Sequence, residues 1–258
     1  MLSIKDTRQT DVMKHLALGL FLVAASACAT LQGKYVWRVR DVALAPTPTV
    51  AFQAGNQTLA LTMNTQTVQK LLLAHIRITR AANVQAELLI VEGSDPNAFV
   101  GLINGRRVVA INTGMIKLIG DDIDEYAALL GHETAHWARG HVHEGERRSS
   151  TLQGMSTLAG MGLGAAGVPA AGLITGFGAD LIEASYNRDD EREADAFGVV
   201  YMRSAGFDPQ AALRLYEKLH RVSSGSLLPF LSTHPSGEER IKNLKALIES
   251  RPAEAPPL

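Results

Sequence analysis

The pattern of apolar and polar residues in the first half of the chain predicts one helix followed by two strands. Between residues 65 and 82, apolar side chains recur every three or four positions, which is the spacing of one helical face. Residues 86–91 and 107–112 are short, mostly apolar runs that predict strands, and the Asn104-Gly105 pair between them is a turn signal. This half is therefore predicted to contain a helix and a small sheet.

The second half of the chain carries residues that start and stop helices. Capping side chains and an early proline mark several helix starts, and Gly140 and Gly206 mark two helix ends. The predicted helices run from Asp121 to Arg139, from about Asp189 to Ala205, onward from Asp208-Pro209, and onward from Ser236, where Glu239 completes a capping box. The whole pattern predicts an α+β fold, in which a mainly helical domain is joined to a small β-sheet.

The composition is that of a globular protein with irregular segments at both ends. Apolar residues make up 46% and charged residues 20% of the 258 residues, which is enough for one large packed domain. Residues 65–250 are predicted to form this domain. Residues 29–64, rich in Thr, Val, Ala and Pro, predict a tether with short extended segments, and residues 251–258 predict a Pro-rich tail. The formal net charge of -1 argues against a nucleic-acid partner, because no basic excess is present to neutralise phosphates.

Residues 1–28 have the layout of a signal peptide that ends in a lipobox. Lys14 supplies a positive start, an apolar stretch follows, and small residues lead up to Cys28. This cysteine is the only one in the chain, so no internal disulfide can form. The segment resembles a bacterial lipobox, whose cysteine is acylated, although Ala25 stands where leucine is usual; a plain signal peptide or a short hydrophobic anchor is the alternative. By resemblance to Gram-negative lipoproteins, Ala29 favours anchoring in the outer membrane, on the periplasmic side of the cell envelope.

A nearly uncharged segment at residues 151–182 is crowded with glycine and alanine and contains Pro169 in its middle. One interpretation is a membrane span or a re-entrant pair. The other is a buried or lid-forming helical hairpin that is broken at the proline. The second is favoured, because glycine and alanine contribute little transfer energy and the proline divides the run.

A zinc-binding pattern lies within the helix predicted from Asp121. Residues 132–136 read His-Glu-Thr-Ala-His. Residues four apart share a helical face, with roughly 5–6 Å between their Cβ atoms, so His132 and His136 can bind one Zn²⁺ ion. Glu133 flanks the metal and is placed to act as a general base for a water molecule. The alternative is a solvent-facing helix with two unrelated histidines, and a third ligand is needed to decide between them.

An acidic cluster 55 residues after His136 can supply that ligand. Glu191 lies near the start of the next predicted helix and would complete a site of two histidines and one glutamate, leaving the fourth position open. Asp195 lies one turn further on and can accept a hydrogen bond from the free ring N–H of His132 or His136. Taken alone, the cluster could be an exposed helix start favoured by the helix dipole; combined with the histidine pair, it indicates a metal site.

With these residues identified, the chain resembles the family of zinc metallopeptidases that includes HtpX, the CAAX prenyl protease and BepA-type proteases. The resemblance covers about residues 65–250. Its motifs occur in the family's order, at Asn97-Ala98-Phe99, at Ala127 to Gly131, at Asn187-Arg188 before Glu191, at Ser232-Thr233-His234-Pro235 and at Glu239-Arg240-Ile241. Asn187 replaces a usual serine, and Gly140-His141 stands where many members have Arg-His, which leaves the role of His141 open.

The resemblance implies a role for each matching residue. The matches are the zinc ligands His132, His136 and Glu191, the catalytic base Glu133, and the supporting aspartate Asp195. His234 matches a loop histidine that in some members reaches the metal and keeps the enzyme latent; alternatively, it only caps a loop. Four further histidines downstream of the signal-like segment are interpreted as local structural or surface residues: His75, His141, His143 and His220.

The expected function is that of a zinc-dependent endopeptidase with one Zn²⁺ per chain, acting in protein quality control in the bacterial envelope. Its substrates would be misfolded or membrane-associated proteins. The alternative is a zinc-containing lipoprotein chaperone or assembly factor with little or latent protease activity. Residues 108–112 could align an extended substrate by edge pairing. The candidate donors to the developing oxyanion are Arg240, Tyr186 and His234.

Overall fold

The computed structural model describes most of the chain between residues 23 and 250. The described residues are 23–26, 29–31, 34–53, 59–103, 105–145, 147, 186–223, 230–231, 234 and 238–250. Most of the predicted signal peptide, the predicted lipidation site Cys28, the segment 151–182, Ser236 and the Pro-rich tail lie outside the described residues. The predictions for these segments stay predictions.

The larger of two sheets has five strands. They lie in the order β2 (Ala29–Leu31), β3 (Lys34–Arg38), β6 (Glu87–Val91), β8 (Arg106–Asn112) and β7 (Ala98–Ile103). Strands β6 and β8 match the two predicted strands, and they pair in parallel, whereas the other neighbours are antiparallel. The turn at Gly105, where φ is +71°, joins β7 to β8.

Strand β7 is absent from the sequence prediction and changes the interpretation of this sheet. Its apolar run contains Gly101, and glycine inside a strand weakens the strand signal. Because β7 takes the side of β8 that faces away from β6, the prediction that residues 108–112 offer an edge to a substrate is wrong. Among the strands that the structure describes, β7 is the edge strand on this side.

Residues 35–64 add strands and core side chains to the folded body. The second sheet has the order β1 (Val23–Ser26), β4 (Thr49–Gln53) and β5 (Leu59–Asn64), and the short helix α1 (Val39–Val42) lies between β3 and β4 in the chain. Trp37 and Phe52 are buried and meet edge to face, with ring centroids 5.5 Å apart. The expected extended segments are therefore present, and the packed core begins upstream of residue 65.

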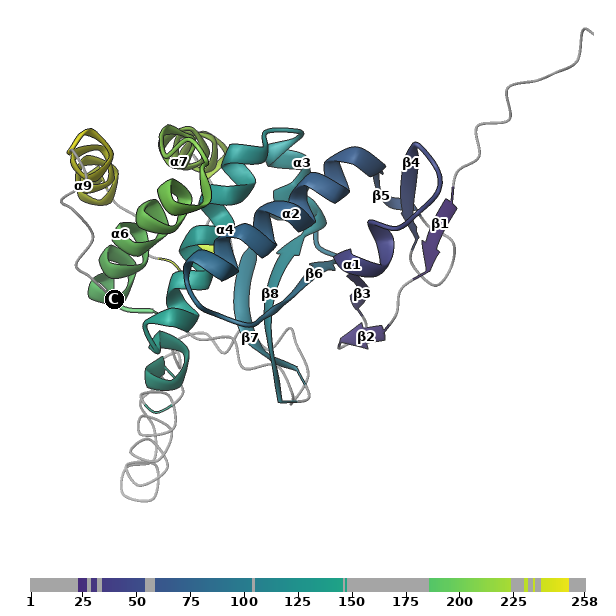
Figure 1. The fold of residues 1–258 in the computed structure, drawn as a ribbon, viewed down its shortest axis with the longest axis horizontal. Helices are drawn as coiled ribbons and strands as arrows, with labels where there is room; N and C mark the ends of the chain where they lie inside the picture. Colours follow the sequence, from purple (N-terminus) through teal and green to yellow (C-terminus); the bar gives the residue numbers. More distant parts are fainter. Residues whose placement is uncertain are drawn as a thin grey trace, which may run out of the picture.

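The helices form a layer around α4. Their bounds are α2 (Thr65–Ala81), α3 (Thr113–Ile119), α4 (Ile123–Ala138), α6 (Arg188–Ala205), α7 (Gln210–Ser223) and α9 (Glu238–Glu249). Helix α4 packs against α2, α6, α7 and strand β7. Helices α6, α7 and α9 gather at the end of the molecule opposite the sheet that contains β4 (Figure 1).

Two glycines allow α4 and α6 to cross closely. A Cβ atom on Gly131 of α4 would lie 3.0 Å from the backbone oxygen of Gly198. A Cβ atom on Gly198 of α6 would lie 3.1 Å from the backbone nitrogen of His132. Since any larger side chain would push the backbones apart, these glycines set how near the acidic start of α6 comes to the histidines of α4.

The observed helix ends follow the signals in the sequence. Helix α4 is capped by Asp122, one residue after the predicted cap, and the chain leaves it at Gly140, where φ is +79°. Helix α6 begins with a capping box between Asn187 and Asp190 and ends at Gly206 in the left-handed region. The architecture confirms the predicted α+β class with a small mixed sheet. None of the helices within the described residues is long and apolar enough to cross a membrane.

Candidate metal centre

Helix α4 presents three polar side chains to the protein interior. His132 and His136 lie one helical turn apart, and their Nε2 atoms are 3.1 Å from each other. Glu133 is completely buried beside them, and both histidines are also buried. Burying three such groups is costly without compensation, so this turn of the helix requires partners from elsewhere in the fold.

The start of α6 supplies the first of those partners. Glu191 is 1% exposed. Its Oε1 atom lies 3.4 Å from Nε2 of His136, and its Oε2 atom lies 3.5 Å from Nε2 of His132. The close crossing at Gly131 and Gly198 brings this carboxylate within reach of both imidazoles.

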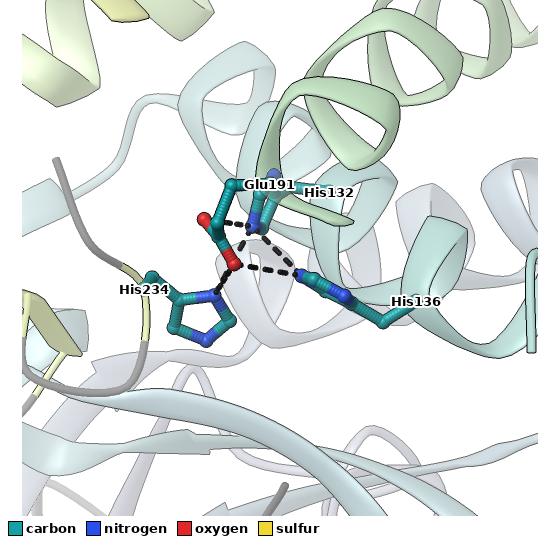
Figure 2. Close-up of side chains that lie close together, drawn as sticks. All are labelled: His132, His136, Glu191 and His234. Atoms are coloured by element: carbon teal, nitrogen blue, oxygen red, sulfur yellow. Dashed lines mark hydrogen bonds and ion pairs between the residues drawn. The ribbon is translucent and has the colours of Figure 1, made fainter. Parts of the chain in front are cut away.

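A fourth group comes from the chain just before α9. His234 is buried, and its Nδ1 atom lies 2.9 Å from Oε1 of Glu191 and 3.3 Å from Nε2 of His132. One ligand atom from each of His132, His136, Glu191 and His234 lies within 4.8 Å of the others. Figure 2 shows the four side chains converging from separate parts of the fold on one small space.

The donor atoms fit a zinc ion. Tetrahedral zinc with ligand distances of about 2.0–2.1 Å places neighbouring donors roughly 3.3 Å apart. Five of the six pair separations among the four groups run from 2.9 to 3.5 Å, counted to the nearer Glu191 oxygen, and the four ligand atoms all lie within 4.8 Å of one another. Two to three imidazoles and a carboxylate are also the donor set that zinc prefers. The residues present are therefore suited to hold this metal.

Glu133 lies beside the cluster without belonging to it. Within the described part of the chain, neither of its carboxylate oxygens makes a hydrogen bond, and Oε1 lies 3.5 Å from Nε2 of His234. Burial raises the pKa of the Glu133 carboxyl, because charge is poorly solvated there. A buried carboxylate with unused acceptor capacity next to a metal site is suited to take up a proton.

The electrostatics of the cluster favour the metal-binding forms of His136 and Glu191, whereas His132 has to lose a proton when zinc binds. Burial lowers the pKa of His136 well below its ordinary value. Burial also lowers the pKa of His132, but Glu191 and Asp195 outweigh it and raise that pKa to about 9. For Glu191, burial raises the pKa, but His234 and His132 outweigh it and hold the pKa well below its ordinary value. The carboxylate is thus ionised, as zinc binding requires.

Asp195 holds His132 from behind. Its Oδ1 atom lies 3.0 Å from Nδ1 of His132 and accepts a hydrogen bond from the hydroxyl of Tyr216 at 3.2 Å. Of the two histidines that Asp195 could support, the structure therefore selects His132. The guanidinium of Arg240 on α9 donates to both oxygens of Asp195, at 2.6 and 2.8 Å, and pairs with Glu191. Because Arg240 already binds two carboxylates, it is a poor candidate for the donor that stabilises the oxyanion of the reaction.

His141 is placed differently from the surface or local position suggested by the sequence. It is 3% exposed, and its Nδ1 atom lies 3.1 Å from Nδ1 of His136. Its Nε2 atom lies 2.8 Å from Oε2 of Glu193. The signal for this contact was a histidine just beyond Gly140, whose φ of +79° lies outside the helical region directly after α4. Tyr186 stacks on the ring of His136, with centroids 3.6 Å apart.

The other histidines that the structure describes lie away from the cluster. His75 is buried on α2, and its Nε2 atom lies 2.9 Å from the carbonyl oxygen of Ala86. His143 meets the ring of Trp137 edge to face, and His220 is exposed on α7. Their structural or surface positions agree with the expectation from the sequence.

Comparison with known proteins also points to a metallopeptidase. Residues 62–248 match peptidase family M48. The chain is 33% identical over 171 residues to mitochondrial metalloendopeptidase OMA1 of Arabidopsis thaliana, covering 66% of this chain and 33% of the relative. It is 26% identical over 151 residues to metalloprotease LoiP of Escherichia coli, covering 58% of each chain.

A third relative is the β-barrel assembly-enhancing protease of Escherichia coli, at 26% identity over 190 residues, covering 70% of this chain and 38% of the relative. The chain spans between about a third and three fifths of the length of the curated relatives it matches. The family match covers more than half of this chain and includes the whole cluster. The chain therefore belongs to peptidase family M48, whose members are zinc-dependent.

Proposed function

We propose that the chain is a zinc-dependent endopeptidase whose metal is held by His132, His136 and Glu191. The observation that carries the proposal is the buried carboxylate of Glu133, which lacks hydrogen bonds and lies beside a donor set suited to zinc. A fold that served only as a binding module would have no use for such a group, because leaving it buried costs stability.

In the proposed reaction, Glu133 accepts a proton from the attacking water molecule and later passes it to the leaving amine. When bound, zinc supplies Lewis-acid polarisation of the peptide carbonyl and makes water more acidic. The raised pKa of Glu133 brings its basicity closer to that needed near neutral pH. Tyr186 and His234 are the remaining candidates for stabilising the oxyanion, because Arg240 is committed to carboxylates.

Strand β7 is the proposed docking edge for an extended substrate. It is the edge strand beside β8, and it packs against the metal-bearing helix α4. An extended peptide that adds to such an edge gains main-chain hydrogen bonds and requires little sequence specificity. This arrangement suits an enzyme that acts on unfolded segments.

His234 is the proposed switch of the enzyme. Its Nδ1 atom lies among the donor atoms of the cluster, while its Nε2 atom faces Glu133 at 3.5 Å. With zinc bound, His234 would be the fourth ligand and would exclude water from that position, so substrate would have to displace it. Replacing His234 with alanine should raise basal activity while zinc remains bound. A fall in activity at full zinc content would instead assign His234 to transition-state stabilisation, and an unchanged rate would leave it as a loop cap.

The proposed setting is quality control of proteins in the bacterial envelope. Support comes from relatives such as the β-barrel assembly-enhancing protease and LoiP of Escherichia coli, and from the signal-like sequence before Cys28. Cys28 is the proposed lipidation site that anchors the protein in the outer membrane, and Cys28→Ser should release it from membranes. Mapping the mature N-terminus by mass spectrometry tests this directly, because a start at any other residue contradicts it.

The catalytic proposal is tested by replacing Glu133 with glutamine in the zinc-loaded protein. Loss of the proton acceptor should lower the cleavage of an unfolded substrate such as casein by about 10²–10⁴-fold, with zinc content unchanged. His132→Ala should remove zinc, and Glu217→Gln, on the exposed side of α7, is the matched control. If Glu133→Gln cleaves casein at the wild-type rate, the mechanism is wrong. Envelope function that survives this substitution in cells would favour the chaperone alternative.

A further inference from the structure

The two histidines of α4 turn both of their ring nitrogens to specific partners. For His132 and His136 alike, Nε2 faces the metal cluster and Nδ1 faces away from it. The outward nitrogen of His132 meets a carboxylate directly, at Asp195. The outward nitrogen of His136 meets another imidazole instead, that of His141 at 3.1 Å.

A carboxylate stands behind that second imidazole. Oε2 of Glu193 lies 2.8 Å from Nε2 of His141, on the side opposite His136. Its Oε1 atom accepts a hydrogen bond from Nε of Arg139 at 2.8 Å and forms an ion pair with Nη2 of the same side chain, also at 2.8 Å. Arg139 is in turn positioned by the ring of Phe197, which lies 4.4 Å from the centre of its guanidinium. Each oxygen of Glu193 therefore has its own donor, and the carboxylate is fixed in direction.

With a neutral His141 ring, this chain of contacts is satisfied by one arrangement of the protons. Glu193 accepts a hydrogen bond from Nε2–H of His141, so the neutral ring of His141 carries its lone pair on Nδ1. That lone pair accepts a hydrogen bond from Nδ1–H of His136. The tautomer of His136 that donates on Nδ1 carries its own lone pair on Nε2, which is the atom that faces the cluster.

We propose that His141 and Glu193 are positioning residues, which fix the tautomer and ring direction of His136 and so tighten its hold on zinc. The inference rests on the proposed metal centre and extends it by two residues that the metal itself does not touch. Gly140, with a φ of +79°, lies between the end of α4 and His141 and sets the direction in which the chain continues from the helix. Tyr186 stacks on the ring of His136 and so helps to hold the plane of that ring.

Packing and hydrogen bonding predict opposite results for two substitutions of His141. Phenylalanine keeps a ring of similar size in the buried space but offers no acceptor to His136. Asparagine is smaller, but its Oδ1 atom is two bonds beyond Cβ, as Nδ1 of histidine is, so it retains an acceptor at about the same place. Positioning by hydrogen bond therefore predicts tighter zinc binding in the asparagine variant, whereas a space-filling role predicts tighter binding in the phenylalanine variant.

The test measures zinc affinity of the purified full chain by competition with a chelator, with zinc alone as the probe. His141→Phe should weaken zinc binding by about 10–100-fold, as expected for loss of an outer partner of a ligand, and His141→Asn by less. His220→Phe, at an exposed histidine on α7, is the control and should bind like wild type. Urea unfolding of the metal-free proteins separates any general loss of stability from the loss of zinc affinity.

Two results would overturn the inference while leaving the proposed function intact. The first is wild-type zinc affinity in His141→Phe, and the second is weaker binding in the asparagine variant than in the phenylalanine variant. A wild-type chain that binds no zinc would overturn both the inference and the proposed metal centre. The expected order, with wild type tightest, then asparagine, then phenylalanine, supports the positioning role.

Discussion

The two sides of the metal centre support their histidines in different ways. Behind His132, Asp195 accepts the imidazole hydrogen bond directly and is itself buried. Behind His136, the supporting carboxylate is one residue further away, at Glu193, and 37% of its side chain is exposed. His141 bridges the gap. Asp195 is therefore part of the buried core, whereas Glu193 lies at the edge of the core.

This difference predicts different energetic roles. On the inner side, Arg240 joins Asp195 and Glu191, so helix α9, Glu191 and His132 form one buried network. Removing a member leaves an uncompensated buried charge, which affects folding as well as metal binding. On the outer side, Glu193 can exchange its protein partners for water, so changes there should affect zinc affinity with little effect on folding.

The largest effect is expected from Asp195→Asn on the inner side. The amide keeps the size of the side chain but removes the charge that compensates Arg240 and orients His132. The free energy of unfolding of the metal-free chain should fall by about 3–5 kcal/mol, and zinc affinity should fall by about 100-fold or more. Urea unfolding and chelator competition measure the two quantities, and Asp41→Asn at an exposed position is the control. Wild-type stability in Asp195→Asn would contradict the coupling of this side to folding.

A smaller effect is expected from straining the turn that places His141. At Gly140, φ is +79°, and a Cβ atom there would meet nothing within 4 Å, so Gly140→Ala adds backbone strain without a clash. Gly120→Ala is a matched control, since φ is +73° and the space is equally open. Both variants should lose about 1 kcal/mol of stability. Only Gly140→Ala should also weaken zinc binding, so equal zinc affinity in the two variants would argue against the outer support.

The parts of the site that could be predicted from the sequence are the residues whose spacing along one helix places them on the same face. His132, Glu133 and His136 share a turn of α4, and their spacing alone placed two imidazoles and a carboxylate together. Glu191 and Asp195 were expected to approach them from the next helix, and the structure brings both residues to the cluster. Local periodicity is sufficient for such residues, because the helix itself fixes their relative positions.

The parts that could not be predicted depend on contacts between distant segments. His141 was left open because its role depends on a turn at Gly140 and on Glu193 from α6, neither of which a local pattern reveals. Strand β7 was not predicted from the sequence because Gly101 interrupts its apolar run. The sequence of residues 35–64 indicates extended segments but not that Trp37 and Phe52 would enter the main core. In each case, tertiary packing decides an outcome that local sequence leaves open.

A modest effect is expected from Glu193→Gln on the outer side. The amide can still accept a hydrogen bond from His141, but it loses the charge that orients the imidazole and pairs with Arg139. Zinc affinity should fall by up to about tenfold, at the lower end of the range for outer partners. Stability of the metal-free chain should change by less than about 0.5 kcal/mol, as is usual at exposed positions. Glu217→Gln is the control, and a large loss of stability in Glu193→Gln would place Glu193 with the inner network.

The smallest expected effect is the change with salt in how strongly the charges of Glu193 and Asp195 influence zinc affinity. The Debye length falls from about 10 Å at 0.1 M to about 3 Å at 1 M ionic strength, and exposed charges are screened far more than buried ones. The charge on Glu193 should therefore matter less at high salt, so the ratio of zinc dissociation constants between Glu193→Gln and wild type should move towards one. The corresponding ratio for Asp195→Asn should stay constant, because Asp195 is buried with Arg240. Using ratios removes the effect of salt on zinc itself, which is common to all variants. If both ratios respond equally, the two supports share one electrostatic environment, and the distinction between a core side and a rim side of this metal centre is lost.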